Sequence, residues 1–448
     1  MRHPGPPIRH NVLAACAIIS LATSTYGQQD RPAPLPPVSS TIPSFTGPTS
    51  LETLVGYALA NNPEIQATRY TAQSLGARVP QAKSLPDPTL MATAFLEEIQ
   101  TASGPQEVAL SLSQKFPWFG KRALRSQVAY FDSMAAYSRV ASTELKVIEQ
   151  VKRAYFDLYF AQKAVSETQQ LQKPLEDVIA VARTRYETST GKVGLESVFQ
   201  AQIELAKLKT DLVKLEETKR RAQARLAGIM HLPPRTQIEA LDTIKRGHVK
   251  NEVETLVGLA ESCQPEFQAT GREMARDRAA VDLARHEYWP DVTTSLNWYE
   301  MGDGGLSPVS NGRDAFSLGV GVNLPIYHHR LDAAVREAEN KLCATARRYD
   351  AIRDQYQSEI ESLDAQFREH HLTIKILEAD IIPRAEETLR LTLDSYRASR
   401  ADFQQLMDVY RTLLRYRVEF HRHLALSQQT LASLERAVGC AVTSQNAK

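Results

Sequence analysis

Two hydrophobic patterns alternate along this chain, and each occurs in both halves. Short runs alternate apolar with small or polar residues, which is the period of a strand with two different faces. In the clearest run, 316–324, Phe, Leu, Val, Val and Leu alternate with Ser, Gly, Gly and Asn. Residues 292–299 and 108–113 alternate in the same way, and 89–96 do so more weakly. These runs predict four strands of about eight to ten residues, close to the length that a tilted strand needs to cross a bilayer.

Long helical patterns fill most of the remaining chain. From 121 to about 187 the helical spacing is interrupted by Pro174, and a second apolar seam runs from Leu331 to Ile381. A repeat held over many heptads is typical of coiled-coil-like helices, and about 65 residues at about 1.5 Å each reach roughly 100 Å. Polar breaks at 188–194 and 398–401 predict hairpin tips, from which further helices over about 195–228 and 402–439 run back.

The two halves repeat one another. LETLVGYALANNPEIQAT at 51–68 returns as VETLVGLAESCQPEFQAT at 253–270, with eleven of eighteen positions identical at an offset of 202. Arg122 and Arg330 match at an offset of 208. We therefore expect one duplicated unit, at 51–250 and at 251–448. The expected parts are a leading helix in each unit, β-hairpins at 88–117 and 290–326, and long helical hairpins at 121–229 and 329–438.

The N-terminus predicts export. Arg2 and Arg9 precede a short apolar run and a small-residue pattern, which indicates a signal peptide over 1–27. Cys16 ends a stretch that looks like a lipoprotein cleavage box, so lipidation is an alternative that the sequence leaves open. The segment 28–50 is rich in proline and predicts an extended arm.

Composition and motifs exclude several functions. The chain carries 53 Lys and Arg against 52 Asp and Glu among 448 residues. This near-balance gives no positive electrostatic field that would attract nucleic acid. Cys263, Cys343 and Cys440 are widely spaced and odd in number, so they predict neither a disulfide framework nor a metal site. The pairs at 328–329 and 370–371 are histidines, but neighbouring side chains point in different directions, so we expect no metal ligand there. The sequence lacks a phosphate loop and a nucleophile elbow, and we expect neither an enzyme nor a cofactor.

Aromatic residues lie at the strand ends. Two soluble hairpins packed on helices would show the same alternation, but two aromatic belts around an apolar band favour membrane strands. The predicted membrane-interface residues are Trp118, Trp289, Trp298, Tyr299 and Tyr327. Four strands cannot close on themselves in lipid, so we expect closure from further copies of the chain.

The chain resembles the TolC-like outer-membrane efflux factors over nearly its whole mature length. The resemblance rests on Leu-Pro-Asp-Pro at 85–88, Ser-Gln-Lys-Phe-Pro-Trp-Phe-Gly-Lys-Arg at 113–122, and Asn-Leu-Pro-Ile-Tyr at 323–327 followed by Arg330. The Pro-Trp-Phe-Gly-Lys-Arg run is similar to the heavy-metal efflux branch. This resemblance implies an α+β membrane protein in the outer membrane of a Gram-negative bacterium, with a homotrimeric twelve-stranded β-barrel that continues into a periplasmic α-helical barrel.

The resemblance also implies partners and sites. The partners would be a periplasmic adaptor protein, an inner-membrane pump of RND type and outer-membrane lipid, with metal cations as cargo. Asp394 and Arg397 are candidates for a charged periplasmic aperture, although a solvated helix face is an equal alternative. The expected adaptor-contacting tips are Gly191, Gly194, Ser399 and Asp402. An exit duct for drug efflux or type I secretion, or a non-conducting coiled-coil scaffold, stays open as an alternative function.

Overall fold

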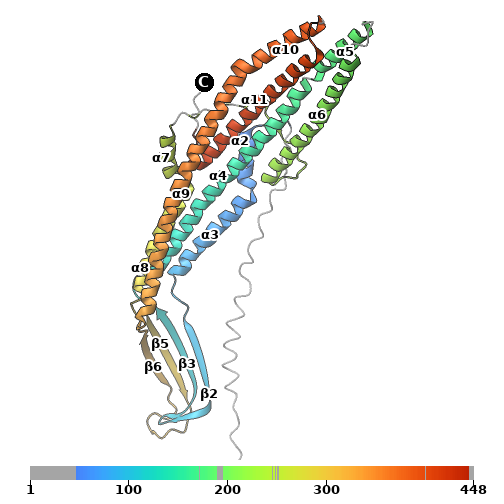
Figure 1. Cartoon of the computed structure of the whole chain (residues 1–448). Helices are drawn as coiled ribbons and strands as arrows, with labels where there is room; N and C mark the ends of the chain where they lie inside the picture. Colours follow the sequence, from blue (N-terminus) through green and yellow to red (C-terminus); the bar gives the residue numbers. More distant parts are fainter. Residues whose placement is uncertain are drawn as a thin grey trace, which may run out of the picture. The chain divides into compact units, whose positions relative to one another are not determined.

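The computed structural model describes residues 47–170, 172–188, 195–244, 246–247, 249, 252–398 and 400–442 (Figure 1). The helices are α2 (Leu51–Asn61), α3 (Pro63–Lys83), α4 (Lys121–Gln170), α5 (Gln172–Thr188), α6 (Leu195–Ile229), α7 (Val253–Cys263), α8 (Pro265–His286), α9 (His328–Ile376), α10 (Ile382–Arg397) and α11 (Phe403–Val438), with a π-helical segment at Leu377–Ile381. The strands are β1 (Pro48–Thr49), β2 (Thr89–Thr101), β3 (Gly104–Phe116), β4 (Glu239–Ala240), β5 (Val292–Met301) and β6 (Ala315–Val322). The predicted signal peptide, most of the predicted arm, Gly191, Gly194 and Ser399 lie outside the described residues.

The chain divides into two compact units, each assembled from separate segments. The described part of the first unit comprises Leu75–Ser133 and Glu273–Thr345, and therefore contains β2, β3, β5 and β6 with the adjoining helix ends. The second unit contains the remaining helical segments, including Met134–Arg272. Each unit thus draws on both halves of the sequence repeat.

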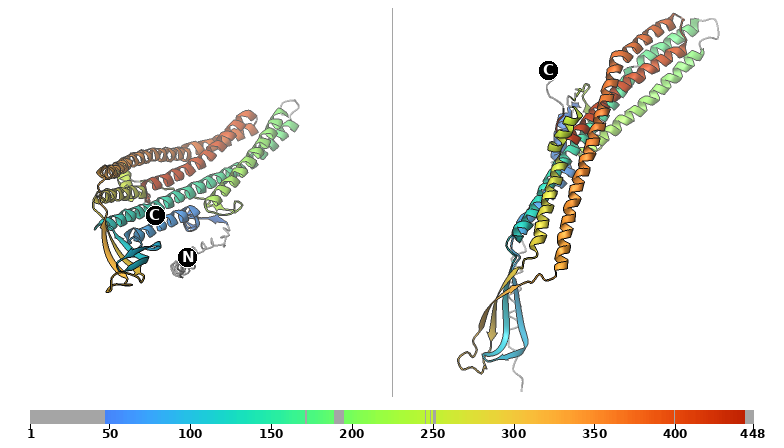
Figure 2. Two further views of the ribbon diagram at one scale, coloured as in Figure 1. Left: turned by 90° about the horizontal axis from the view of Figure 1, so that it is seen from below. Right: turned by 60° about the vertical axis from the view of Figure 1, so that its left-hand side comes forward.

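The first unit is built around a four-stranded antiparallel sheet with the order β2-β3-β5-β6. Figure 2 shows these strands side by side. β2 and β3 have 13 residues each, longer than predicted, and Gly104 permits their tight turn with a φ of 127°. The pairing of β2 with β3 shifts between Ala94 and Ile99. This irregularity begins at the end of the run 89–96, whose alternation is weak in the sequence.

Each repeated stretch forms two helices rather than one. α2 ends where Asn62 takes an extended conformation with a ψ of 123°, and Pro63 begins α3. In the second repeat Gln264 is extended in the same way before Pro265 begins α8. Proline disfavours helical backbone in the residue before it but fits the first position of a helix, so the repeated proline sets both breaks.

The long helices of the second half are also interrupted near a proline. α9 runs for 49 residues and leads directly into the π-helical segment Leu377–Ile381, which α10 continues. Pro383 follows within the first turn of α10, and its ring and missing N–H disturb the preceding helical hydrogen bonds. A wider turn accommodates that disturbance without ending the helix.

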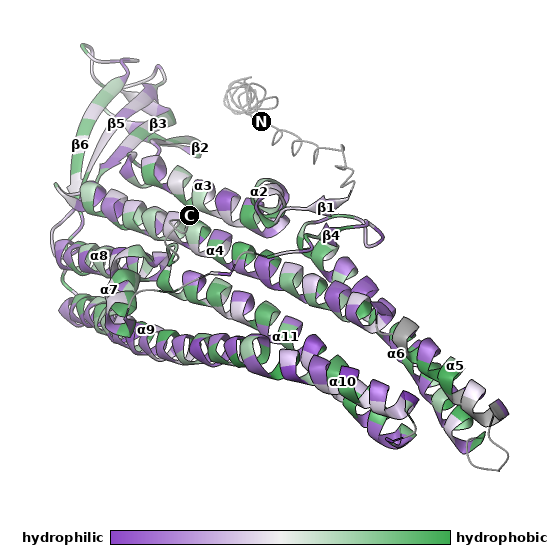
Figure 3. Ribbon diagram, turned by 90° about the horizontal axis from the view of Figure 1, so that it is seen from above, coloured by the Kyte–Doolittle hydropathy of each residue, from purple (hydrophilic) through white to green (hydrophobic). Residues whose placement is uncertain are grey.

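The second unit contains three clusters of buried apolar residues. The largest surrounds Tyr155 and Leu158 of α4, where the Tyr155 hydroxyl receives the Leu241 N–H at 3.0 Å. Nearby, β1 pairs in parallel with β4, so the last residues of the predicted arm form a short strand. A second cluster joins α5, α6, α10 and α11 and includes Leu175, Ala201 and Tyr410. Figure 3 shows hydrophobic and hydrophilic residues interleaved along these helices.

Candidate functional site

The four-stranded sheet carries different chemistry on its two faces. The strand register places Leu90 opposite Leu112, Leu112 opposite Leu296, and Leu296 opposite Leu318, so four leucines cross the sheet in one row. The next row on this face holds Ala92, Leu110, Trp298 and Phe316. The four leucines are between 47% and 76% exposed in the single chain. An exposed apolar face of this extent indicates contact with lipid or protein.

The opposite face is small and polar in β3, β5 and β6. One row on this face lies between the leucine row and the row that contains Trp298. In strand order it holds Met91, Ser111, Asn297 and Ser317. Asn297 donates a hydrogen bond to Ser317 Oγ at 3.1 Å across the β5–β6 pair. Ser295 lies opposite Gly319, where an added Cβ would come within 2.5 Å of the Ser295 hydroxyl. This face is therefore compatible with water, as a channel lining requires.

The register revises the predicted aromatic belt. Trp298 lies on the apolar face and donates its indole N–H to Asp314 at 3.1 Å, whereas Tyr299 lies on the polar face because consecutive side chains alternate. The side chains of Trp298 and Tyr299 therefore lie on opposite faces of the sheet. At the other end of the strands, Trp118 and Trp289 stack with ring centroids 5.4 Å apart. Tyr327 is exposed and precedes α9.

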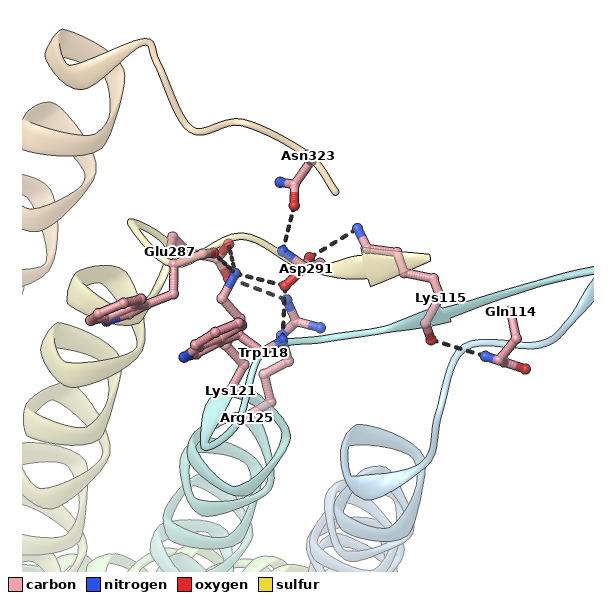
Figure 4. Close-up of polar contacts among 9 residues, drawn as sticks. Gln114, Lys115, Trp118, Lys121, Arg125, Glu287, Asp291 and Asn323 are labelled. Carbon is pink, nitrogen blue, oxygen red and sulfur yellow. Dashed lines mark hydrogen bonds and ion pairs between the residues drawn. The ribbon is translucent and has the colours of Figure 1, made fainter. Parts of the chain in front are cut away.

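A buried ion-pair cluster lies where the two hairpins join their helices (Figure 4). Lys121, at the start of α4, is fully buried, and its Nζ lies 2.8 Å from Asp291 Oδ1, 2.8 Å from the Trp289 carbonyl and 3.3 Å from Glu287. Arg125 donates to the other oxygen of Glu287 at 3.2 Å. We call this set of five residues the junction cluster. It links the end of β3 to the start of β5.

Asp291 is the centre of the junction cluster. Its carboxylate accepts the Trp118 N–H at 3.0 Å and lies 3.1 Å from Lys115 Nζ, while its backbone N–H donates to the Asn323 side chain after β6. Burial by itself would raise the pKa of this carboxyl, but the hydrogen bonds from Lys121, Trp118 and Lys115 lower it to about 2. Asp291 is therefore charged at neutral pH, and its contacts hold the ends of β3, β5 and β6 together.

The Pro-Trp-Phe-Gly-Lys-Arg motif has a structural explanation in this region. Gly120 has a φ of 89°, which a residue with a side chain adopts at a cost, and it turns the chain from β3 into α4. Arg122 donates twice to the Lys83 carbonyl, at 2.7 and 3.0 Å, and so satisfies the last residue of α3. Sequence analysis did not single out Asp291. The repeat contained the signal, because Pro-Asp at 86–87 returns at 290–291.

The predicted aperture residues lie in the last turn of α10. Arg397 Nη1 is 3.7 Å from Asp394 Oδ1, and both side chains are more than half exposed. Tyr396, between them, is buried in the cluster that joins the four helix ends. Asp402 accepts the Phe403 N–H at 2.7 Å and caps α11, so its contact with an adaptor stays a prediction. Gly191, Gly194 and Ser399 lie outside the described residues.

The adjacent histidines at 370–371 have different neighbours, and one of them contacts a histidine of another helix. His370 of α9 lies with its Nδ1 3.2 Å from Nδ1 of His423 in α11. His371 instead stacks on Phe367. Among the described residues no group of three or more His, Cys, Asp or Glu side chains could hold a metal ion. In the part of the chain that the structure describes, every helix is too short or too polar to be a membrane span.

Comparison with known proteins shows which proteins this chain resembles. Residues 54–230 match the family model described as outer membrane efflux protein. The cobalt-zinc-cadmium resistance protein CzcC of Cupriavidus metallidurans is 21% identical over 416 residues, which cover 90% of this chain and 93% of CzcC. The outer membrane protein VceC of Vibrio cholerae superposes with a TM-score of 0.72 at 20% identity, covering 88% of this chain and 96% of VceC. For CusC the TM-score is 0.73 at 17% identity, and the coverage is 92% and 99%.

A two-faced sheet joined to long helical hairpins is therefore the fold of an outer-membrane channel protein. Over residues 54–230 the chain resembles the outer membrane efflux protein family, and it shares its fold with VceC and CusC. The predicted family resemblance and the fold class of the chain are confirmed, and the match agrees with the predicted outer-membrane location.

Proposed function

We propose that this chain is the outer-membrane exit duct of a tripartite efflux system that exports metal cations from the periplasm or the cytoplasm to the exterior. The observation that carries the proposal is the strand register, which puts leucines on one face of the sheet and serine and asparagine on the other. A non-conducting scaffold would gain nothing from a polar inner face. In such a system the chain supplies a passage and contacts a periplasmic adaptor. An RND-type pump in the inner membrane supplies the driving force.

The working form in this proposal is a homotrimer. β2 and β6 form the two edges of the sheet and lack a second neighbouring strand within the described residues. Unpaired backbone groups in lipid cost several kcal/mol each, so a membrane sheet must close. Three copies of a four-stranded sheet make a twelve-stranded barrel, in which β6 of one copy pairs with β2 of the next.

The proposed cargo rests on the resemblance to CzcC, which is named for resistance to cobalt, zinc and cadmium. A strain without this chain should therefore grow less well on Co²⁺, Zn²⁺ and Cd²⁺ and accumulate those ions, while antibiotic tolerance stays at the parental level. Return of the parental chain on a plasmid is the control. Loss of antibiotic tolerance or of protein export with unchanged metal tolerance would assign the duct to a different cargo.

Two neighbouring residues provide a direct test of the channel itself. Leu296 and Asn297 are consecutive in β5 but lie on opposite faces of the sheet. Leu296→Lys should place a charge in lipid, cost about 2–4 kcal/mol near the bilayer centre and reduce the amount of assembled trimer. Asn297→Lys should assemble normally and shift the selectivity of single channels towards anions. Equal assembly of the two variants, measured by native mass in detergent, would contradict the assigned faces.

A further inference from the structure

Two cysteines that are far apart in the sequence lie side by side in the second unit. Cys263 is the last residue of α7, and Cys440 follows the end of α11, 177 positions later. Both side chains are partly buried and both are free thiols, whereas Cys343 is exposed on α9. Their sequence spacing gave no sign of this proximity.

Close packing of two backbone segments brings the cysteines together. Gly439 ends α11 with a φ of 85°, and a Cβ on it would lie 2.6 Å from Gln264 Cα and 2.8 Å from the carbonyl carbon of Cys263. The Gln264 side chain donates to the carbonyls of Arg436 and Ala437 at 2.7 and 3.1 Å. These contacts fix the residue after Cys263 and the residue before Cys440, so the two thiols are brought together by the backbone.

The first repeat is arranged differently at this point. There Asn62 donates its side-chain N–H to the Ile229 carbonyl at the end of α6, at 3.0 Å. Gly228 matches Gly439 at an offset of 211, and a Cβ on Gly228 would have nothing within 4 Å. The close approach of the two backbone segments and the thiol pair are therefore both particular to the second copy.

We propose that Cys263 and Cys440 form a disulfide in the mature protein, which fastens the end of α7 to the end of α11. The chain is an outer-membrane protein, and exported chains pass through a compartment where disulfides form and persist. The oxidant is the disulfide of a periplasmic dithiol protein. A thiolate of Cys263 attacks that disulfide and releases one thiol, and the Cys440 sulfur then displaces the second and forms the new S–S bond. Two protein thiols are oxidised, and the two oxidant sulfurs leave as thiols with both protons.

The surroundings of Cys440 suit a stable bond. Burial, and then the hydrogen bond with the Cys263 thiol, raise the pKa of Cys440 to about 11. At neutral pH this thiol stays protonated and attacks slowly, which is why Cys263 takes the first step. A thiol of high pKa is also a slow leaving group, so attack by small thiols on the Cys263 sulfur, which releases Cys440, should be slow.

The test is a thiol count on full-length protein extracted from outer membranes under acid, denatured, and alkylated with N-ethylmaleimide before any reductant is added. We expect one alkylated cysteine, Cys343, and three after reduction. Proteolysis should yield a linked pair of peptides that contain Cys263 and Cys440. Three alkylated cysteines without reduction, or a link that involves Cys343, would overturn the proposal.

Matched variants separate the bond from the fold. Cys343→Ser should leave no reactive thiol without reduction, and Cys263→Ser should leave two, Cys343 and Cys440. Reduction should lower the thermal midpoint of the parent and of Cys343→Ser but leave that of Cys263→Ser/Cys440→Ser unchanged. An equal effect of reduction on the double variant would show that the thiol pair carries no structural bond.

Discussion

Lys121 and Asp291 form an ion pair that links the two hairpins, with 2.8 Å between Nζ and Oδ1 and side chains that are 0% and 5% exposed. Three oxygen partners replace the hydration that this buried lysine lacks. Lys121 begins α4, and Asp291 precedes β5, so the pair couples the position of a helix to the position of a strand.

Loss of one partner of this pair should be more harmful than loss of both. Asp291→Asn leaves the Lys121 charge buried without its main partner, and we expect about 3–5 kcal/mol of destabilisation. Lys121→Met/Asp291→Asn should recover part of that loss. The exposed pair Lys341 and Glu337 is a matched control, and Lys341→Met should change little. Thermal denaturation of detergent-solubilised protein measures the three variants against the parent, and a double variant that is less stable than Asp291→Asn would argue against a coupled pair.

Stability of the helical region should fall in mild acid because of His370. Burial and the neighbouring His423 lower the pKa of His370 from its ordinary value of 6.5. The folded state therefore binds this proton less readily than the unfolded chain. Above about pH 6.5 His370 is neutral in both the folded and the unfolded state, so it causes no loss of stability. As the pH falls further, His370 of the unfolded chain gains its proton first, and the folded state becomes less stable.

The measurement is helix melting by circular dichroism between about pH 8 and about pH 5. His370→Gln should remove part of the acid loss, and His329→Gln, exposed in the same helix, should not. Glu369 favours the protonated form, and Glu419 lies 3.8 Å from His423 Nε2, so the two carboxylates reduce the effect. Identical pH profiles for the parent and His370→Gln would exclude His370 as the source.

We propose that Asp394 and Arg397 narrow the periplasmic mouth when three copies meet. Their mutual contact is loose and solvated, so the single chain gains little from it. Replacement of both by Ala should raise single-channel conductance in planar bilayers and leave thermal stability unchanged. Glu387 and Arg390 form a similarly spaced exposed pair in the same helix, and their double replacement is the control. Parental conductance in the first variant would place the constriction elsewhere.

We propose that the helical tips contact the adaptor, because they lie where the helical hairpins reverse. Gly194→Trp should reduce metal tolerance because a bulky side chain would separate the tip from its partner, while the yield of trimer stays normal. Gly228→Trp is the control, because Gly228 lies in α6 with open space around it. Normal metal tolerance of Gly194→Trp would remove this tip from the adaptor interface.

Local periodicity is sufficient to predict the helices and strands, but it does not predict the contacts where they join. The alternation at 316–324 predicts β6 because each side chain reports the face that it occupies. The contact between Lys121 and Asp291 joins residues 170 positions apart, and it exists because β3 and β5 pair in one register. A single sequence does not specify that register. The same holds for His370 with His423, whose partnership depends on how two helices pack.

Two other differences have local causes that were visible but ambiguous. Pro63 and Pro265 belong to the most obvious repeated stretch, where the pattern predicts one helix but each proline begins a second. Trp298 and Tyr299 share the aromatic character of a membrane interface, although adjacent strand residues face opposite sides. In both cases the residue type is plain in the sequence, but the backbone geometry decides the outcome.

The two open edges of the sheet also have a genetic consequence. Because β2 and β6 find partners in other copies in the proposed trimer, a chain that folds but cannot conduct will still enter assemblies with normal chains. With equal expression, random mixing leaves roughly one assembly in eight without the variant chain. A gating-defective allele should therefore be dominant over the normal gene, whereas an allele that prevents strand formation should be recessive.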